Sequence, residues 1–284
     1  MTPGAAGAAD PGLDRDPDPD PGALFSDAAA YPGASELVTC RIAGETAEIE
    51  LNRPERLNAA SAELIWGLAH ALHRVREARC RVVVLSGAGR AFCAGHDLKA
   101  PPLPRHSEAA RRHLDRLQFV SRALRDPELV SVANVHGFAY GAGIELALSC
   151  DFVVAERATL FRFPEVSVGL SVTGGISFYL PQAIGMPRAK ELIMLGEPFD
   201  AQTAHTLGMI TRVVDGDARH ELSARITERL LELPHEALAL AKGTIERVFA
   251  DVAARAMALE IENGLDTGGA ADAEAARARF SGRA

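Results

Sequence analysis

The chain has 284 residues, of which 48% are hydrophobic and 24% charged, and its net charge is −8 at pH 7. This length fits one large domain or two small ones, and either could bury a core. Seven acidic residues and one basic residue lie within residues 1–36, so the rest is close to neutral and lacks the basic excess that nucleic-acid binding needs. The sequence also lacks an apolar run of about 18 residues, a signal-peptide pattern, and disulfide or metal spacing among its four cysteines. We therefore expect a soluble cytoplasmic protein that binds neither membrane nor nucleic acid.

Residues 1–36 are rich in Ala, Gly, Pro and Asp, and Asp alternates with Pro over residues 16–21. Such a segment has too little apolar surface to offset the entropy that ordering would cost. We predict a disordered acidic tail over residues 1–36, with folded sequence beginning near Leu37.

Strands and helices alternate in the next part of the chain. Residues 37–42 and 46–51 flank a short turn, which is typical of a hairpin. Ser61 can cap a helix that runs to about residue 78, and the apolar run 82–86 predicts a buried strand. Further helices are expected at 109–124 and 141–149, and further strands at 129–135, 152–155 and 159–162, with a loop over 136–140.

After Pro164 the pattern becomes mostly helical. Helices are expected at 176–184, 188–195, 201–207, 219–231, 236–249 and 252–263, with one strand at 210–214. This order predicts an α/β fold built from right-handed βαβ units and followed by a helical region.

Two loops of small residues each follow a predicted buried strand, and they contain Ala94–Asp97 and Gly141–Gly143. Small residues let a ligand approach the backbone closely, and a helix N-terminus offers unpaired N–H donors. Two such N–H groups that converge on one carbonyl oxygen would form an oxyanion hole. The alternative is that the small residues only allow tight packing of helix starts on strands.

Two glutamates add to this pattern. Glu145 lies in an otherwise apolar helix, on the face shared with the residues three and four before it. A buried carboxylate without partners is costly, so stability alone would favour another residue there. Glu165 follows Pro164 at the end of a short strand, and together the two acids could handle one water and one proton.

Four ordered motifs make the chain resemble the crotonase (enoyl-CoA hydratase/isomerase) superfamily over about residues 37–265. They are residues 51–59 (LNRPERLNA), 89–99 (GRAFCAGHDLK), 136–146 (HGFAYGAGIEL) and 163–165 (FPE) with Gly169. The resemblance implies a crotonase fold, with repeated ββα and βαβ turns that form two roughly perpendicular sheets. It places the catalytic core at 37–215 and a C-terminal helical oligomerisation region at 216–284, and it implies homotrimers or homohexamers.

The resemblance also implies roles for single residues. The backbone N–H groups of His96 and Ala142 would form the oxyanion hole for a thioester oxygen, and Glu145 and Glu165 would be catalytic. Contacts with coenzyme A and the substrate would come from Arg53, Arg56, Ala94, Asp97, Leu98, Lys99 and Gly141. The implied reaction is hydration of a trans-2-enoyl-CoA by a lyase, with no metal and no redox cofactor, since coenzyme A is part of the substrate.

The sequence departs from the family pattern at three places. The loop 171–175 reads SVTGG where hydratases usually have a Pro-Gly-Ala-Gly-Gly run, Ala142 replaces a common Gly, and residues 270–284 compress the family's terminal helix. The altered loop keeps an enoyl-CoA isomerase or a specialised acyl-CoA dehydratase as alternatives. A catalytically silent binding or assembly protein is a further alternative, against which the two costly carboxylates argue.

Overall fold

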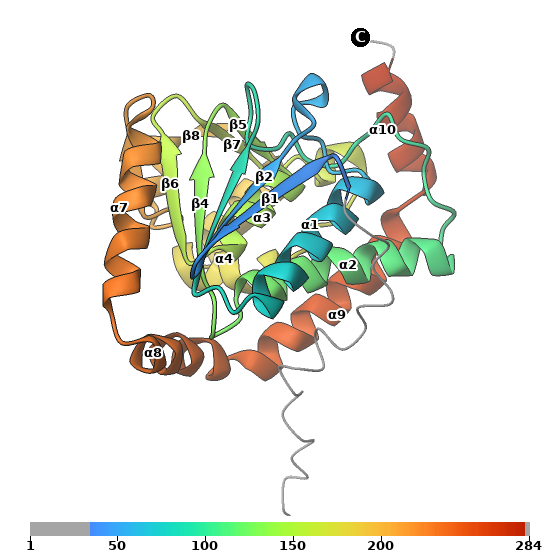
Figure 1. Cartoon of the computed structure of the whole chain (residues 1–284). Helices are drawn as coiled ribbons and strands as arrows, with labels where there is room; N and C mark the ends of the chain where they lie inside the picture. The colour runs from blue at the N-terminus through green and yellow to red at the C-terminus, as the bar shows by residue number, and fades with distance from the viewer. Residues whose placement is uncertain (1–34, 282–284) are drawn as a thin grey trace, which may run out of the picture.

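The computed structural model describes residues 35–281, so the predicted tail lies almost wholly outside the described residues. Nine strands form two sheets within this range: a six-stranded sheet of order β1-β2-β3-β4-β6-β9 and a three-stranded sheet of order β5-β7-β8 (Figure 1). The strands are β1 (Val38–Ala43), β2 (Thr46–Leu51), β3 (Val82–Gly87), β4 (Val130–Val135), β5 (Phe138–Tyr140), β6 (Phe152–Glu156), β7 (Leu160–Arg162), β8 (Phe199–Asp200) and β9 (Arg212–Val214). The α/β architecture with two sheets agrees with the fold class expected from the sequence.

Helices surround the sheets, and most of them lie within a few residues of their predicted places. They are α1 (Ala62–Glu77), α2 (Glu108–Leu124), α3 (Ala142–Ser149), α4 (Ile176–Ile184), α5 (Met186–Leu195), α6 (Ala201–Thr206), α7 (Ala218–Glu232), α8 (His235–Arg247), α9 (Ala250–Thr267) and α10 (Ala271–Ser281), with short 3-10 turns η3 (Pro54–Arg56) and η4 (Val166–Val168). Along residues 35–281, every helix is too short or too polar to cross a lipid bilayer.

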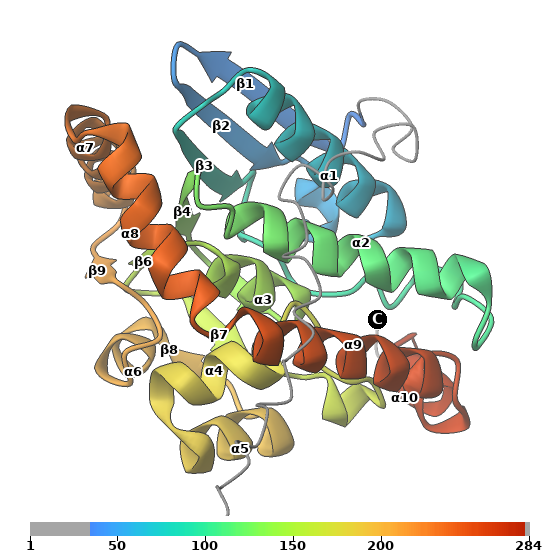
Figure 2. The same cartoon turned by 90° about the horizontal axis from the view of Figure 1, so that it is seen from below.

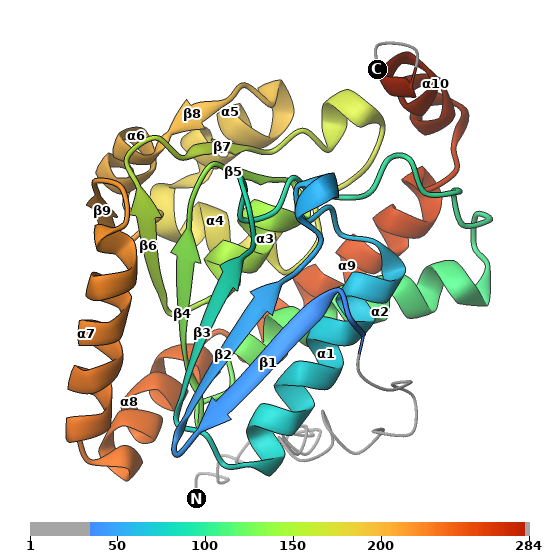
Figure 3. The ribbon, with the colours of Figure 1, turned by 45° about the horizontal axis from the view of Figure 1, so that its top comes forward.

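The six-stranded sheet brings two loops to one edge. β1 and β2 form the predicted antiparallel hairpin, whereas β2, β3, β4, β6 and β9 pair in parallel. Parallel strands all end at the same edge of their sheet, where the following loops can build a site. The chain therefore leaves β3 and β4 at neighbouring points, and both following segments lie above the sheet in Figure 3.

The three-stranded sheet begins where the sequence predicted a loop over residues 136–140. Phe138–Tyr140 form β5, which is parallel to β7, and β7 is antiparallel to β8. The prediction of a loop is wrong because three residues between glycines give no periodic signal. Only pairing with β7, distant in sequence, makes this segment a strand.

Helices cover both faces of the six-stranded sheet. Along β3, Val83 and Leu85 belong to the main core with α1, α2 and α3, which Figure 2 shows from below. Val82 belongs instead to a second cluster with Val132 and with Leu230 of α7. Because successive strand residues point to opposite faces, α7 covers the face opposite to α1 and α2.

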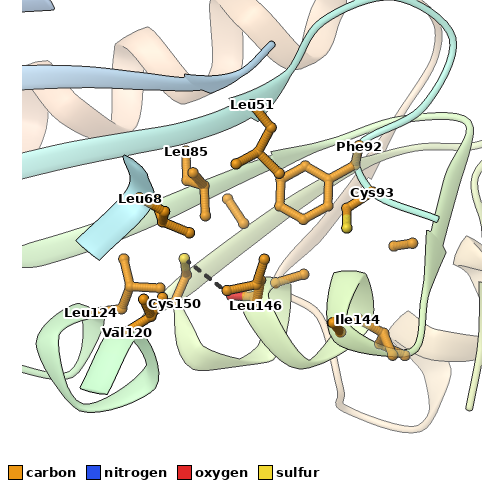
Figure 4. Packing of buried hydrophobic residues seen from close by; sticks show 14 of the residues in the cluster. Leu51, Leu68, Leu85, Phe92, Cys93, Val120, Leu124, Ile144, Leu146 and Cys150 are labelled. Atoms are coloured by element: carbon orange, nitrogen blue, oxygen red, sulfur yellow. Dashed lines mark hydrogen bonds between the residues drawn. The ribbon is translucent and has the colours of Figure 1, made fainter. Parts of the chain in front are cut away.

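The first of the two loops is anchored in the main core. Phe92 and Cys93 are buried among Leu51, Leu85 and Leu146, as Figure 4 shows. Aliphatic and aromatic side chains buried in this way fix the backbone that carries them, since a close-packed interior tolerates little displacement. The loop that follows Cys93 therefore starts from a rigid position.

The C-terminal helices return to the same end of the molecule. α9 packs against α2 and α4, and α10 packs against η4. The sequence predicted a compressed terminal helix after residue 270, but residues 271–281 form a helix whose Ala273 and Ala276 are buried. Its backbone approaches closely, since a Cβ on Gly169 would lie 2.7 Å from the N atom of Ala273. The helix α10 therefore packs against the turn that follows Glu165.

Candidate active site

The two small-residue loops pack directly against each other. The N–H of Cys93 donates to the carbonyl of Phe138 at 3.0 Å, and the N–H of Tyr140 donates to the carbonyl of Cys93 at 3.0 Å. A Cβ on Gly143 would lie 2.1 Å from that same Cys93 oxygen, so only glycine fits there. The small residues therefore do serve tight packing, and this packing brings the segments with His96 and Ala142 together.

Each loop presents a backbone N–H that is not used elsewhere in the fold. Among the described residues, no hydrogen bond involves the N–H of His96 or of Ala142. Ala142 is the first residue of α3, whose N-terminal amides have no partner within the helix. Gly141 carries the positive φ of 52°, and Ala142 is not among the residues with positive φ, so alanine causes no strain there.

Glu145 is buried in α3 with 4% of its surface exposed. Its carboxylate accepts two hydrogen bonds from Thr173, from the backbone N–H at 2.7 Å and from the hydroxyl at 2.6 Å. Burial raises the pKa of Glu145 to about 7, the Thr173 hydrogen bonds oppose this rise, and the negative charge of Glu260 adds to it. A carboxyl with this pKa can hold or release a proton near neutral pH.

Glu165 is buried to the same degree but lacks hydrogen-bond partners. Its side chain is 2% exposed, and neither carboxyl oxygen has a partner among the described residues. Its Oε1 lies 2.9 Å from the place that a Cβ on Gly141 would occupy, so the carboxyl contacts the second loop. Burial raises the pKa of Glu165 well above its usual value, and the nearby charge of Glu145 raises it further, while Arg162 lowers it.

A cavity of about 490 Å³ is lined by Glu165, His96 and Gly141, whereas Glu145 and Ala142 are not among its lining residues. Four cationic side chains also line it: Arg56, Arg90, Lys99 and Arg162. Cations in this arrangement suit a ligand with phosphate groups.

Comparison with known proteins identifies the family. The enoyl-CoA hydratase/isomerase family model matches residues 41–283. The chain belongs to the enoyl-CoA hydratase/isomerase family. It is 35% identical over 217 residues to the 1,2-epoxyphenylacetyl-CoA isomerase of Escherichia coli, covering 74% of this chain and 82% of that protein. It is 32% identical over 243 residues to the mitochondrial enoyl-CoA hydratase domain-containing protein 2 of Bos taurus, covering 82% of each.

A solved structure agrees with this family assignment. The enoyl-CoA hydratase from Mycobacterium avium subsp. paratuberculosis superposes with a TM-score of 0.78 at 25% sequence identity, covering 88% of this chain and 97% of that one. The crotonase fold expected from the sequence is therefore confirmed.

Most residues that the sequence placed near coenzyme A in this family member do meet at one cavity. The residues that line it are Arg56, Ala94, Asp97, Leu98, Lys99 and Gly141. Arg53 is not among the lining residues; its Nη1 instead donates to Oδ2 of Asp97 at 2.6 Å and to the carbonyl of Ala59 at 3.3 Å. The described contacts of Arg53 thus tie the segment after β2 to the loop that contains Ala94–Asp97.

The altered loop 171–175 proves to be the partner of Glu145. Thr173 lies in this loop, and its hydroxyl donates to Oε2 of Glu145 at 2.6 Å. The loop is held in turn by Ser121, whose hydroxyl donates to the carbonyl of Gly174 at 2.7 Å. The departure from the family pattern therefore still supplies hydrogen-bond donors to the buried Glu145.

A third buried glutamate, Glu260 of α9, was not predicted from the sequence. It is 2% exposed and accepts from the N–H of Gly175 at 2.8 Å and from Nε2 of Gln118 at 2.8 Å. The N–H and hydroxyl of Ser177 also donate to it, at 2.9 Å and 2.6 Å. A signal was present, because Glu260 falls seven residues after Ala253 and so on the buried face of α9.

A second, smaller cavity of about 170 Å³ adjoins the first. The two share His96, Asp97 and Leu170 in their lining. Thr173 lines only the smaller cavity, so the partner of Glu145 faces it. Within residues 35–281, no group of three or more His, Cys, Asp or Glu side chains is arranged to hold a metal ion.

Proposed function

We propose that the protein adds water to a trans-2-enoyl-CoA to form a 3-hydroxyacyl-CoA. The observation that carries this proposal is the pair of buried, electrostatically coupled carboxyls, Glu145 and Glu165, beside two loops with unused backbone N–H groups. Environments that raise carboxyl pKa values toward neutrality are typical of acid/base pairs.

The thioester oxygen accepts hydrogen bonds from the N–H groups of His96 and Ala142. These donors stabilise the negative charge that develops on the oxygen and so draw electrons from the double bond. Glu145 and Glu165 hold the attacking water, whose oxygen forms the bond to C3. Glu165 gives its proton to C2, and the proton released by the water restores the protonation of the carboxyl pair, so the net change is addition of H and OH.

Coenzyme A is part of the substrate in this proposal and occupies the larger cavity. Arg56, Arg90, Lys99 and Arg162 supply positive charge for its phosphates. The smaller cavity next to Thr173 takes the acyl group. The chemistry derived for these residues calls on no metal or redox group.

One observation favours a second function, isomerisation of a 3-enoyl-CoA to a 2-enoyl-CoA. Both oxygens of Glu145 are engaged by Thr173, whereas both oxygens of Glu165 are free of partners among the described residues. A single free carboxyl suffices to move a proton between C4 and C2. The isomerase relative from Escherichia coli is consistent with this alternative.

Two substrates separate the two functions. Crotonyl-CoA and longer 2-enoyl-CoAs lose their conjugated absorbance on hydration, whereas trans-3-hexenoyl-CoA gains it on isomerisation. Glu145→Gln and Glu165→Gln should each lower hydration by about a hundredfold or more, with the exposed Glu228→Gln as control. If Glu145→Gln leaves turnover of every substrate intact, hydration by a carboxyl pair is wrong and the isomerase function replaces it.

We also propose that the protein assembles as a homotrimer or as a hexamer of two trimers. Large apolar side chains are exposed on the described single chain along α5, α8 and α9, including Met194, Leu195, Ile245, Val248 and Leu259. Exposed large apolar side chains in this number are typical of a surface that a partner chain covers. A monomer mass in sedimentation at micromolar concentration would refute the assembly.

A further inference from the structure

The smaller cavity has an unbalanced charge in its lining. Most of the lining is apolar or neutral, and two ionised side chains contribute to it, Asp97 and Arg277. Asp97 is already neutralised, because Nη1 of Arg53 donates to it at 2.6 Å and the N–H of Lys99 donates to it at 3.0 Å. The charge of Asp97 is therefore compensated within the protein and does not require a ligand in the cavity.

Arg277 lies on α10 and has no such counterpart. Its Nη1 donates to the carbonyl of Ala100 at 3.0 Å. No carboxylate among residues 35–281 forms an ion pair with it. A guanidinium has five N–H donors in a fork that matches a carboxylate, so one bond to a carbonyl leaves most of them available.

The two histidines that line the smaller cavity do not add a charge to it. The rings of His96 and His113 lie 6.0 Å apart between centroids. Burial lowers the pKa of His96 to about 3, with smaller effects from His113 and Arg277, and burial with the charge of Arg116 lowers that of His113 to about 4. Both rings are neutral near pH 7, and the guanidinium of Arg277 is the charge that the cavity presents.

We propose that the smaller cavity receives an acyl group that ends in a carboxylate, and that Arg277 binds this carboxylate. The substrate class is then the mono-CoA thioester of a short unsaturated dicarboxylic acid, with the thioester at His96 and Ala142 and the far carboxylate at α10. The unsaturation rests on the proposed hydration, whereas the binding of the carboxylate does not. A neutral hydrocarbon tail would leave the guanidinium beside an apolar group, which is unfavourable.

Binding of saturated analogues tests the inference without any turnover. Calorimetry would compare glutaryl-CoA with valeryl-CoA, and adipyl-CoA with hexanoyl-CoA, so that each pair matches in chain length. The protein should bind the dicarboxylic member of at least one pair about tenfold more tightly or better, as a charge-assisted pair with Arg277 implies. Two chain lengths are used because the distance from the thioester to Arg277 selects one of them.

Substitutions on α10 test whether Arg277 causes the preference for the dicarboxylic ligand. Arg277→Met should remove the preference by weakening the dicarboxylic ligand about tenfold, while the neutral ligand changes less than about threefold. Arg277→Lys should keep part of the preference, since it keeps the charge but loses the fork. Arg279→Met, an exposed arginine on the same helix, should leave both ligands unchanged.

Two results would overturn the inference. One is equal affinity for the two members of both pairs in the unaltered protein. The other is equal weakening of both members in Arg277→Met, which would mean that Arg277 only fixes α10 against Ala100. If glutaryl-CoA binding depends on Arg277 but glutaconyl-CoA is not hydrated, the proposed hydration fails and the carboxylate site stands.

Discussion

Replacing Glu260 with alanine removes an acceptor shared by three residues from two parts of the chain. Gly175 begins the turn into α4, Ser177 lies in its first turn, and Gln118 lies in the middle of α2. In the variant, four donors lose their common partner: the N–H groups of Gly175 and Ser177, the Ser177 hydroxyl and the side-chain amide of Gln118. Glu260, Gly175 and Gln118 are buried, whereas Ser177 is exposed, so water replaces the lost acceptor only in part.

The cost follows from that count of donors. A buried donor left without a partner costs about 1–3 kcal/mol, and partial hydration favours the lower end for each of the four. The total is about 3–5 kcal/mol, the range found when one member of a buried charged network is removed. For a domain of this size each kcal/mol lowers Tm by about 2–4 °C, so a fall of about 10 °C is expected.

Urea denaturation and thermal melting of the variant measure this loss. Glu262 provides the matched control, because it lies two residues further along α9, is exposed, and pairs with Arg111. Glu262→Ala should change stability by less than about 1 kcal/mol, as exposed ion pairs do. Equal stability of Glu260→Ala and Glu262→Ala would refute the claim that the hydrogen bonds to Glu260 stabilise the fold.

Glu260→Gln tests the electrostatic effect of Glu260 through the pH–rate profile, which a loss of stability alone would not shift. The charge of Glu260 contributes to the raised pKa of Glu145, after burial as the main cause. Removing the charge should lower the pKa of Glu145, so the limb of the pH–rate profile that reports ionisation of Glu145 should move to lower pH. A limb that moves to higher pH would contradict the electrostatic link between the two carboxyls.

Three further changes test the site. Gly143→Ala should lower Tm strongly in thermal melting, since its Cβ would lie 2.1 Å from the Cys93 oxygen; an unchanged Tm would contradict the packing. Ala142→Pro removes one oxyanion N–H at the first helical position, where proline is tolerated, so turnover should fall about 10²–10³-fold with little loss of Tm. The pKa of Glu145 is raised from 4.5 to about 7, so its contribution to stability is present below pH 4.5 and lost as pH rises through about 7. Urea titrations at pH 5 and pH 8 should therefore show that the free energy of unfolding falls less between these pH values in Glu145→Gln than in the unaltered protein. An equal fall in both proteins would refute the raised pKa.

Elements with a local signal were predictable from the sequence. Ser61 caps α1 as expected, with its hydroxyl accepting from the N–H of Leu64 at 3.2 Å. The long amphipathic helices and the buried Val-rich strands lie close to their predicted bounds because apolar spacing is a local property. β5 and β8 were missed because strands of three and two residues exist only through pairing with β7.

The residues of the candidate site were also predictable only where they have a local sequence signal. An acid in the apolar helix α3 indicated a buried Glu145, and its burial is confirmed. Its partner Thr173 lies 28 residues away, and Glu260 lies 85 residues from Gly175. Such partners depend on how α4 and α9 pack, and a single sequence does not encode that packing in any local pattern. The ion pair of Arg53 with Asp97, 44 residues apart, was missed for the same reason.

The three buried glutamates of the described chain differ in how many donors they receive, and this difference bears on their roles. Glu260 accepts four hydrogen bonds, Glu145 accepts two, and Glu165 has no partner among the described residues. None of the three forms an ion pair within residues 35–281, so hydrogen bonds are the main stabilisers of a negative charge here, and Arg162 adds a smaller effect at Glu165. When the site holds fewer charges than carboxyls, the proton belongs on the group with the fewest donors, which is Glu165. That is the residue to which the proposed hydration assigns delivery of the proton to C2, and the partnered Glu145 is then left to accept a hydrogen bond from the attacking water.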